Sequence, residues 1–214
     1  MTGKLQSNES PMHSRISDFI AARAAETYPE PRTYGHDGLT AQMAPLVAAM
    51  LPVGASVLDV GCGQGPALDW FQQHGHYPIG ITTNTADLRA CEANGHEVHP
   101  VDMHKLPDSF ERYPFDCIWA RHVLEHSVIP FFVLHEFARV LKPGGILYVE
   151  VPSPGTDCRH EANPNHYSVL TCGMWLQLIQ RAGFEILEVR EINIKTDAGP
   201  DTYFSIIARK QPNS

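Results

Sequence analysis

A glycine-rich turn after a short apolar run constrains the fold of this chain more than any other feature. The segment Val57–Gly65 reads Val-Leu-Asp-Val-Gly-Cys-Gly-Gln-Gly and leads into a predicted helix. Glycine has no Cβ, so the backbone at such a turn can approach a ligand closely. In open α/β sheets, ligands lie beyond the carboxyl ends of the strands, where the strand order reverses. We therefore expect a bound ligand at Gly61–Gly65.

The glycine-rich turn has two alternative interpretations, a dinucleotide site and a turn without a ligand. A dinucleotide site with the pattern G-x-G-x-x-G requires a further glycine at position 66, where the chain has Pro66. The spacing here is G-x-G-x-G, and Asp59 lies two residues before it. The second alternative is a tight turn that serves packing only and binds no ligand. The turn by itself does not exclude it.

Strands and helices are predicted to alternate after residue 55. We expect strands at Ser56–Val60, Tyr77–Ile81, Glu97–Val101, Phe115–Ala120 and Ile146–Val151, and helices at Pro66–His74, Thr85–Ala93, Ile129–Leu141 and Leu170–Ala182. Strands separated by helices imply βαβ units and a parallel sheet covered on both faces.

The end of the chain departs from this alternation. Glu185–Ile194 and Thr202–Arg209 are joined only by a predicted turn at Thr196–Pro200, so they must be antiparallel neighbours. Lys142–Gly145 is predicted to be a turn into the fifth strand. The predicted fold is a doubly wound, mostly parallel seven-stranded α/β sheet of the Rossmann-like kind, with an antiparallel terminal strand and a helical N-terminal extension.

Two segments are expected: residues 1–52 as an N-terminal tail and helical cap, and residues 53–210 as the ligand-binding domain. Met1–Pro11 is polar and is expected to be disordered. Ser14–Thr27 and Leu39–Leu51 carry apolar residues at helical spacing, and Tyr28–Gly38 is predicted to be a loop. Pro45 predicts a kink or a later start of the second helix.

Charge and composition limit the partners of the chain. The net charge is −8 and no Lys/Arg cluster stands out, which disfavours nucleic acid, since phosphate backbones require a concentrated basic face. No apolar run approaches the ~20 residues that a spanning helix needs. The N-terminus lacks a secretory pattern, and the five cysteines form no C-x-x-C pair. We expect a cytoplasmic protein with free thiols and a small-molecule partner, and the sequence leaves its oligomeric state open.

Further motifs follow the glycine turn in a fixed order. They are Val101-Asp102-Met103, Phe115–Trp119 with His122–His126, Arg139–Gly145 and Arg181–Phe184. Together with Asp59–Gly65, they resemble the class I S-adenosylmethionine-dependent methyltransferases of the type 11/12-like branch, over roughly Ala55 to Ala182. The resemblance implies S-adenosyl-L-methionine as cofactor and S-adenosyl-L-homocysteine as product.

The resemblance also implies roles for individual residues. Gly61 and Gly63 would line the methionine part of the cofactor, and Cys62 would offer backbone there. Asp59 would reach the amino group, because a cationic amine pairs with an anionic neighbour. The remaining predicted cofactor contacts are Asp102 as acceptor for the adenine amine, Met103 through its backbone, and Thr82, Thr83 and Arg121.

One position departs from the pattern of this family. Most relatives end the second strand in an acidic residue that binds both ribose hydroxyls, whereas this chain has Thr82. One hydroxyl cannot accept two hydrogen bonds as a carboxylate does, so weaker cofactor binding or a different ribose partner is expected. In related enzymes an N-terminal helical segment folds over the cofactor, which makes Arg32 and Tyr34 of the N-terminal loop candidates for cofactor contact. The alternative for them is a surface loop.

Methyl transfer requires alignment, and a hydroxyl acceptor also requires a general base. His122, at the end of the fourth strand, can titrate near neutrality. The alternative for His122 is a loop histidine that orders the Val123–His126 turn. His166 and Tyr167 lie in the long loop Pro152–Ser168 and are the best candidates for acceptor contact or for the base, because long loops at this edge of the sheet tend to carry substrate specificity. The alternative for them is a polar lid.

A bound metal is not expected, because the candidate ligands in that loop match no structural zinc spacing. They are Asp157, Cys158, His160, Glu161 and His166. The predicted function is methyl transfer to a small-molecule acceptor by O- or N-methylation, for example a sugar or a secondary metabolite. The alternative is a protein that binds S-adenosylmethionine without transferring the methyl group, or that performs different chemistry with the same cofactor.

Overall fold

A sheet whose strand order reverses between β1 and β4 organises the described part of the chain. The structure is a computed structural model that describes residues 11–24, 26 and 34–212. Within them the sheet has the order β3-β2-β1-β4-β5-β7-β6. Its strands are β1 (Ser56–Val60), β2 (Tyr77–Ile81), β3 (Val98–His99), β4 (Phe115–Arg121), β5 (Leu141–Pro152), β6 (Phe184–Thr196) and β7 (Gly199–Lys210).

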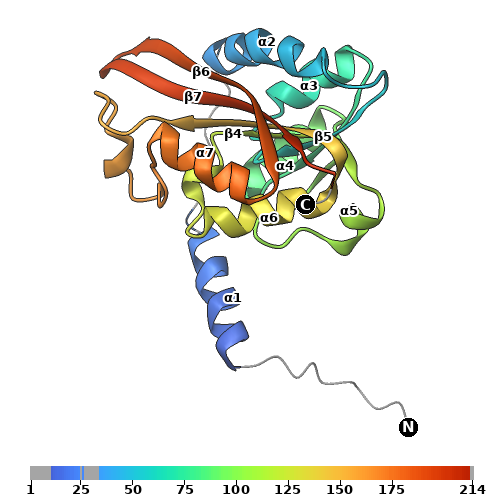
Figure 1. The fold of residues 1–214 in the computed structure, drawn as a ribbon, viewed down its shortest axis with the longest axis horizontal. Helices are drawn as coiled ribbons and strands as arrows, with labels where there is room; N and C mark the ends of the chain where they lie inside the picture. The colour runs from blue at the N-terminus through green and yellow to red at the C-terminus, as the bar shows by residue number, and fades with distance from the viewer. Residues whose placement is uncertain (1–10, 25, 27–33, 213–214) are drawn as a thin grey trace.

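Helices cover both faces of this sheet, while α1 projects away from the body of the molecule (Figure 1). None of the described helices is both long enough and apolar enough to cross a bilayer. The helices are α1 (Pro11–Ala24), α2 (Tyr34–Ala48), α3 (Pro66–Gln73), α4 (Thr85–Ala93), α5 (Asp108–Arg112), α6 (Pro130–Val140) and α7 (Cys172–Arg181), with short 3-10 turns η1 (Leu124–His126) and η2 (His160–Ala162).

The central strands are mostly apolar on both of their faces, because both faces are buried. Successive residues of a strand point to opposite sides. Ile118 and Leu147 therefore join the core formed with α6 and α7, whereas Trp119 and Tyr148 join the core formed with α2 and α3. The predicted doubly wound sheet is confirmed.

The hairpin of β6 and β7 is longer than predicted. The two strands pair from Phe184↔Lys210 to Thr196↔Gly199, so the predicted turn at Thr196–Pro200 shortens to two residues. β7 is antiparallel to both β5 and β6, which confirms the antiparallel terminal strand.

Several predicted boundaries are wrong. α2 begins at Tyr34, so residues 34–38 are helical and not a loop, and Pro45 lies inside this helix. Burial of Met43, Ala44 and Val47 in the core stabilises the helix around Pro45. The predicted tail at residues 1–10 and the role considered for Arg32 lie outside the described residues.

Two more local predictions differ from the structure. Lys142–Gly145 is a bulge within β5 and not a turn before it, since the pairing jumps from Phe115↔Leu141 to Cys117↔Ile146. The third strand covers only Val98–His99 and is shorter than the predicted Glu97–Val101. The helix α5 was not predicted, because its five residues have no buried face to produce an apolar pattern.

Candidate functional site

A cavity of about 520 Å³ opens at the carboxyl ends of β1, β2 and β4, at the point where the strand order reverses. This is the place where open α/β sheets bind ligands. Apart from Arg32 and Tyr34, whose side chains lie outside what the structure describes, every residue that the sequence predicts for the site lines this cavity. These residues are Asp59, Gly61, Cys62, Gly63, Thr82, Thr83, Asp102, Met103, Arg121, His122, His166 and Tyr167.

The three glycines of the turn are required for different reasons. Each has a positive φ, of 65°, 51° and 83° for Gly61, Gly63 and Gly65. A Cβ on Gly61 would lie 2.8 Å from the Val123 side chain, and one on Gly65 would press on His96. A Cβ on Gly63 would meet nothing within 4 Å. Close approach to a ligand therefore explains Gly63 only, and the other two glycines are explained by packing and backbone conformation.

Cys62 closes the turn upon itself. Its backbone N–H donates to the Ile81 carbonyl at 3.1 Å, and its own carbonyl accepts from the Gly65 N–H at 2.9 Å. Burial and the carboxylates of Asp59 and Asp87 contribute, after a hydrogen bond with Cys91, to raising the pKa of its thiol. The N–H group of Cys62 is therefore already used within the protein, and contact of the Cys62 backbone with a ligand stays a prediction.

Asp59 is the strongest indication of a ligand in the cavity. Its side chain is 3% exposed, and its Oδ2 atom has no hydrogen-bond partner among the described residues. Burial raises the pKa of this carboxyl well above its usual range, against an opposing effect of Arg121. Because buried polar atoms almost always have a partner, this oxygen fits a donor on a bound ligand.

Asp102 is held by a neighbouring histidine. Its Oδ1 atom accepts from the His104 backbone N–H at 2.9 Å and from His104 Nδ1 at 2.7 Å, and His104 Nε2 lies 2.8 Å from Ser127 Oγ. Burial raises the pKa of Asp102, but the hydrogen bonds from His104 outweigh it and leave the pKa below its ordinary value. The cavity therefore contains an ionised acceptor at the end of β3.

Thr82 contributes to the start of α4. Its hydroxyl accepts from the Asn84 N–H at 3.1 Å, and the Asn84 side chain caps α4 by accepting from the Ala86 and Asp87 N–H groups. Thr83 is exposed at the rim. Asp87 is buried and also lines the cavity. Sequence reasoning missed this carboxylate because it lies within a helix and not at a strand end.

Arg121 and His122 share a buried carboxylate that was not predicted. Glu150 on β5 is fully buried and lies 2.7 Å from Arg121 Nε and 2.9 Å from His122 Nε2, and it accepts from the Tyr148 hydroxyl. Burial raises the pKa of Glu150, but these three partners outweigh it and lower the pKa to about 2. The Nη2 atom of Arg121 has no hydrogen-bond partner in the described chain.

His122 is fixed in an unusual conformation. Its φ of 53° lies in the left-handed region, and its ring stacks on Tyr203 with centroids 4.4 Å apart. Because Nε2 is engaged by Glu150, only Nδ1 remains to serve as a base.

The loop after β5 places His166 and Tyr167 differently. The Nδ1 atom of His166 is buried without a hydrogen-bond partner within the described residues. Burial, together with the nearby His126 and His160, lowers the pKa of His166 to about 4, so its imidazole is neutral at physiological pH. The Tyr167 hydroxyl donates to Glu26 at 2.7 Å, and this engagement does not favour the predicted role as a base.

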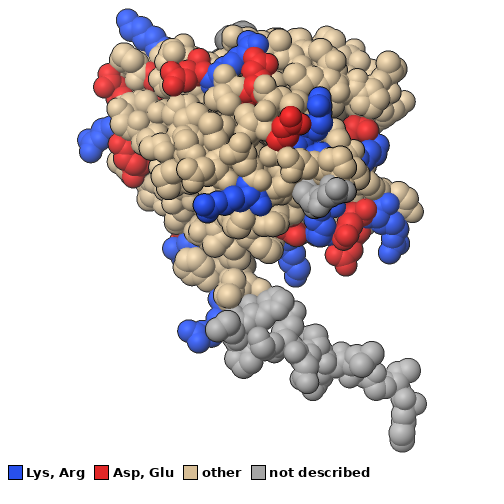
Figure 2. Space-filling model, in the orientation of Figure 1, with Lys and Arg blue, Asp and Glu red and all other residues tan. Residues whose placement is uncertain are grey.

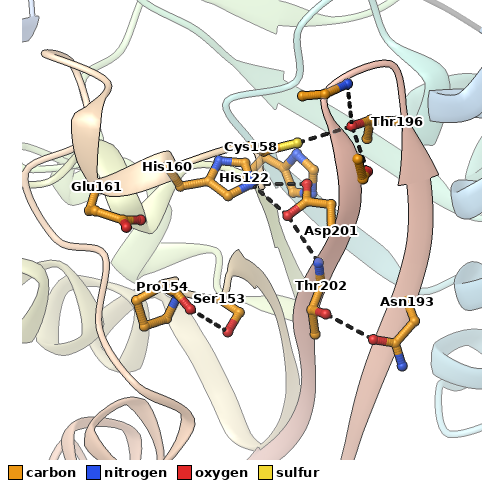
Figure 3. Close-up of polar contacts among 12 residues, drawn as sticks. His122, Ser153, Pro154, Cys158, His160, Glu161, Asn193, Thr196, Asp201 and Thr202 are labelled. Carbon is orange, nitrogen blue, oxygen red and sulfur yellow. Dashed lines mark hydrogen bonds and ion pairs between the residues drawn. The ribbon is translucent and has the colours of Figure 1, made fainter. Parts of the chain in front are cut away.

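A second cluster is made by Cys158 and His160 of this loop together with Asp201 of β7 (Figure 3). Both carboxylate oxygens of Asp201 lie 3.0–3.1 Å from His160 Nε2, and Cys158 Sγ lies 3.2 Å from the Thr196 hydroxyl. Burial raises the pKa of Asp201, but hydrogen bonds, first from His160, lower it. Asp201 and Tyr203 come from β7, far along the chain, and no local pattern marked them.

Charged side chains of both signs are interspersed over the face shown in Figure 2, without a broad area of one sign. This agrees with the scattered Lys and Arg residues of the sequence.

A family described as a methyltransferase domain matches residues 34–189 of the chain. A 27-O-demethylrifamycin SV methyltransferase from Amycolatopsis mediterranei is 31% identical over 128 residues, which are 54% of this chain and 47% of that protein. The chain thus spans about half the length of the curated relatives it matches.

Solved structures share the fold. A 1,6-didemethyltoxoflavin-N1-methyltransferase from Burkholderia thailandensis, with bound 1,6-didemethyltoxoflavin and S-adenosylhomocysteine, superposes with a TM-score of 0.67 at 17% identity, covering 99% of this chain and 93% of that one. The cyclase SpnF superposes with a TM-score of 0.65 at 23% identity, covering 94% of each chain.

Proposed function

Because this chain belongs to the class I S-adenosylmethionine-dependent methyltransferase family, we propose that it transfers the methyl group of S-adenosylmethionine to a small-molecule acceptor, by O- or N-methylation. The observation that carries this proposal is the cavity at the strand-order reversal, where Asp59 Oδ2, without a hydrogen-bond partner among the described residues, lies with the open position at Gly63.

The residues of the cavity fit the cofactor of this family. Asp59 accepts from the cationic amino group, Asp102 accepts from the adenine amine, and the missing Cβ of Gly63 leaves room for the methionine part. Thr82 and Asp87 serve the ribose, so the carboxylate absent from the end of β2 is supplied from α4. The cofactor supplies a methyl group that is already activated on a sulfonium sulfur.

The acceptor side is rich in histidine. His122, His126, His160 and His166 line the same cavity as the cofactor residues. Such a wall suits a polar acceptor with a hydroxyl or an amine. His166 is the first candidate to take the proton of a hydroxyl, since its imidazole is neutral and Nδ1 has no partner among the described groups. His122 is the second, through Nδ1, and Tyr167 contacts the acceptor at the rim.

In this proposal the two segments that meet near residue 53 have different functions. We propose that the described helices of the segment 1–52, α1 and α2, act as a cap on the domain at residues 53–210. Arg23 of α1 and Leu39 and Thr40 of α2 line the cavity, which supports this arrangement.

A second candidate is a protein that binds S-adenosylmethionine without methyl transfer, or that performs different chemistry with it. Thr82, in place of the usual acidic residue, favours this alternative. The test has two parts: calorimetry with S-adenosylmethionine and S-adenosylhomocysteine measures binding, and formation of S-adenosylhomocysteine with a panel of hydroxyl and amine acceptors measures transfer. Tight binding without turnover on any acceptor class supports the second candidate.

Replacing Asp102 with alanine is expected to weaken cofactor binding by about 1–3 kcal/mol, because a buried acceptor for the adenine amine is lost. Calorimetry with S-adenosylhomocysteine measures the change. Asp108→Ala is the matched control, since that carboxylate is almost fully exposed at the start of α5. Equal affinity in the two variants would place the adenine away from Asp102.

Replacing His166 with alanine is expected to lower turnover by about 100-fold or more, the range for loss of a positioned proton acceptor. The affinity for S-adenosylhomocysteine stays unchanged, because His166 faces the acceptor. Initial rates and calorimetry measure the two effects. His135→Ala, an exposed histidine on α6, is the control. Normal turnover in His166→Ala rejects the role of this side chain.

A further inference from the structure

Glu125, His126 and His166 bring one carboxylate and two imidazoles together on the acceptor wall of the cavity. One ligand atom from each residue lies within 4.8 Å of those of the other two, and all three side chains line the cavity. Two imidazoles and one carboxylate are a set that divalent transition metals bind while leaving positions open for water or substrate.

The backbone holds the two sides of this cluster in place. The N–H groups of Tyr167 and Ser168 both donate to the Glu125 carbonyl, at 2.8 and 2.9 Å. The Ser168 hydroxyl donates to the Ser127 carbonyl at 2.7 Å. The loop that carries His166 is therefore fastened directly to η1, which carries Glu125 and His126. A preorganised pair of segments reduces the cost of bringing the ligands together.

The ring of His126 makes the kind of hydrogen bond that metal-binding imidazoles make. His126 Nδ1 lies 2.9 Å from the Asn165 carbonyl oxygen. A carbonyl only accepts, so this nitrogen carries the proton and the lone pair lies on Nε2. A backbone carbonyl is a usual outer partner of a metal-ligating histidine. In His166, Nδ1 is buried and has no hydrogen-bond partner in the described part of the chain.

The neighbouring cluster of Cys158, His160 and Asp201 does not have the hydrogen-bond arrangement of a metal site. His160 Nε2 is already bonded to Asp201, and Cys158 is paired with Thr196 (Figure 3). The His160 ring stacks against His166 with centroids 5.6 Å apart. This second cluster therefore joins the loop to the hairpin of β6 and β7.

We propose that Glu125, His126 and His166 bind a divalent transition metal ion, with zinc as the expected metal, at the acceptor end of the cavity. The sequence expectation of no metal considered only ligands within the loop Pro152–Ser168. Glu125 and His126 come from η1, about forty residues earlier, so spacing within the loop could not reveal the set.

The role of the ion rests on the proposed function. A metal ion lowers the pKa of a bound hydroxyl by several units. An acceptor hydroxyl bound to the ion loses its proton to water, and its oxygen then forms a bond to the methyl carbon while the bond from that carbon to sulfur breaks. The acceptor class is thus a hydroxylated molecule whose oxygen reaches the ion. With the ion bound, His166 is a metal ligand, and water takes the acceptor proton in its place.

Titration of the chelator-treated full-length protein with Co²⁺ tests the site without any use of activity. We expect a visible d–d absorption that saturates at one equivalent and is displaced by Zn²⁺. Glu125→Gln, His126→Ala and His166→Ala should each weaken Zn²⁺ binding about 10-fold or more in calorimetry. His135→Ala should bind as the unaltered protein does.

The results of these metal-binding measurements show whether the proposed site, or only its location, is wrong. Absence of Co²⁺ absorption in the unaltered protein, or unchanged Zn²⁺ affinity in His166→Ala, overturns the proposal. Loss of binding in His160→Ala with retention in His166→Ala also overturns it, by moving the metal to the second cluster. Circular dichroism shows that each variant is folded, and the conservative Glu125→Gln remains informative if His126→Ala does not fold. Binding of S-adenosylhomocysteine to metal-free protein distinguishes failure of this inference from failure of the proposed function.

Discussion

Gly63→Val is expected to reduce binding of S-adenosylhomocysteine by at least about 100-fold, or about 2.8 kcal/mol. A Cβ at this position meets no protein atom within 4 Å, and Gly63 lines the cavity, so the added methyl groups occupy space that the cofactor needs. Calorimetry measures the loss. Gly61→Val would be less informative, because its side chain would collide with Val123 and disturb the fold itself.

Gly75→Val is the matched control for this prediction. Gly75 also has a positive φ, of 80°, and a Cβ there also meets nothing within 4 Å, but Gly75 does not line the cavity. Both variants carry the backbone strain of a branched residue at positive φ. Equal cofactor affinity in the two variants would remove the glycine turn from the binding site.

Glu150→Ala is expected to lower the free energy of unfolding by about 3–5 kcal/mol. The carboxylate is fully buried, and the Arg121 side chain, 9% exposed, would keep its charge without its partner. Urea denaturation measures the change. Glu185→Ala, an exposed glutamate at the start of β6, is the control and should change stability little. A small decrease in unfolding free energy for Glu150→Ala would show that groups other than Glu150 stabilise the charge of Arg121.

The same carboxylate predicts a pH dependence. Its pKa falls from an ordinary value of 4.5 to about 2 on folding, so its ionised form stabilises the protein above pH 4.5. That contribution, about 3 kcal/mol, is lost as the pH falls from 4.5 towards 2. Glu150→Gln should therefore show a flatter decline of unfolding free energy over this range than the unaltered protein. Parallel declines would contradict the lowered pKa.

The sequence predicted the parts of the fold that depend on local patterns. β2 and α4 have the predicted bounds, because an apolar run and a capped helix are each determined by neighbouring residues. The same holds for the cofactor side of the cavity, whose residues follow directly after strand ends and could be located once the strands were known.

The acceptor side could not be predicted in the same way. Glu150 lies within the predicted strand Ile146–Val151, and its contact with His122 depends on the pairing of β4 with β5. Asp201 and Tyr203 reach the site only because β7 inserts between β5 and β6. His126 and His166 meet through two backbone hydrogen bonds across forty residues. Contacts between segments distant along the chain leave no periodic pattern.

The wall that faces the acceptor is built from two kinds of segment, which has a consequence for changing its selectivity. Tyr203 and Asp201 belong to a strand whose other side chains are packed in the sheet, so altering them risks misassembly of the hairpin. Gly155–His166 runs over the surface, and substitutions there disturb few packed neighbours. Divergence of substrate choice among related proteins, or its redirection in the laboratory, should therefore begin in that loop.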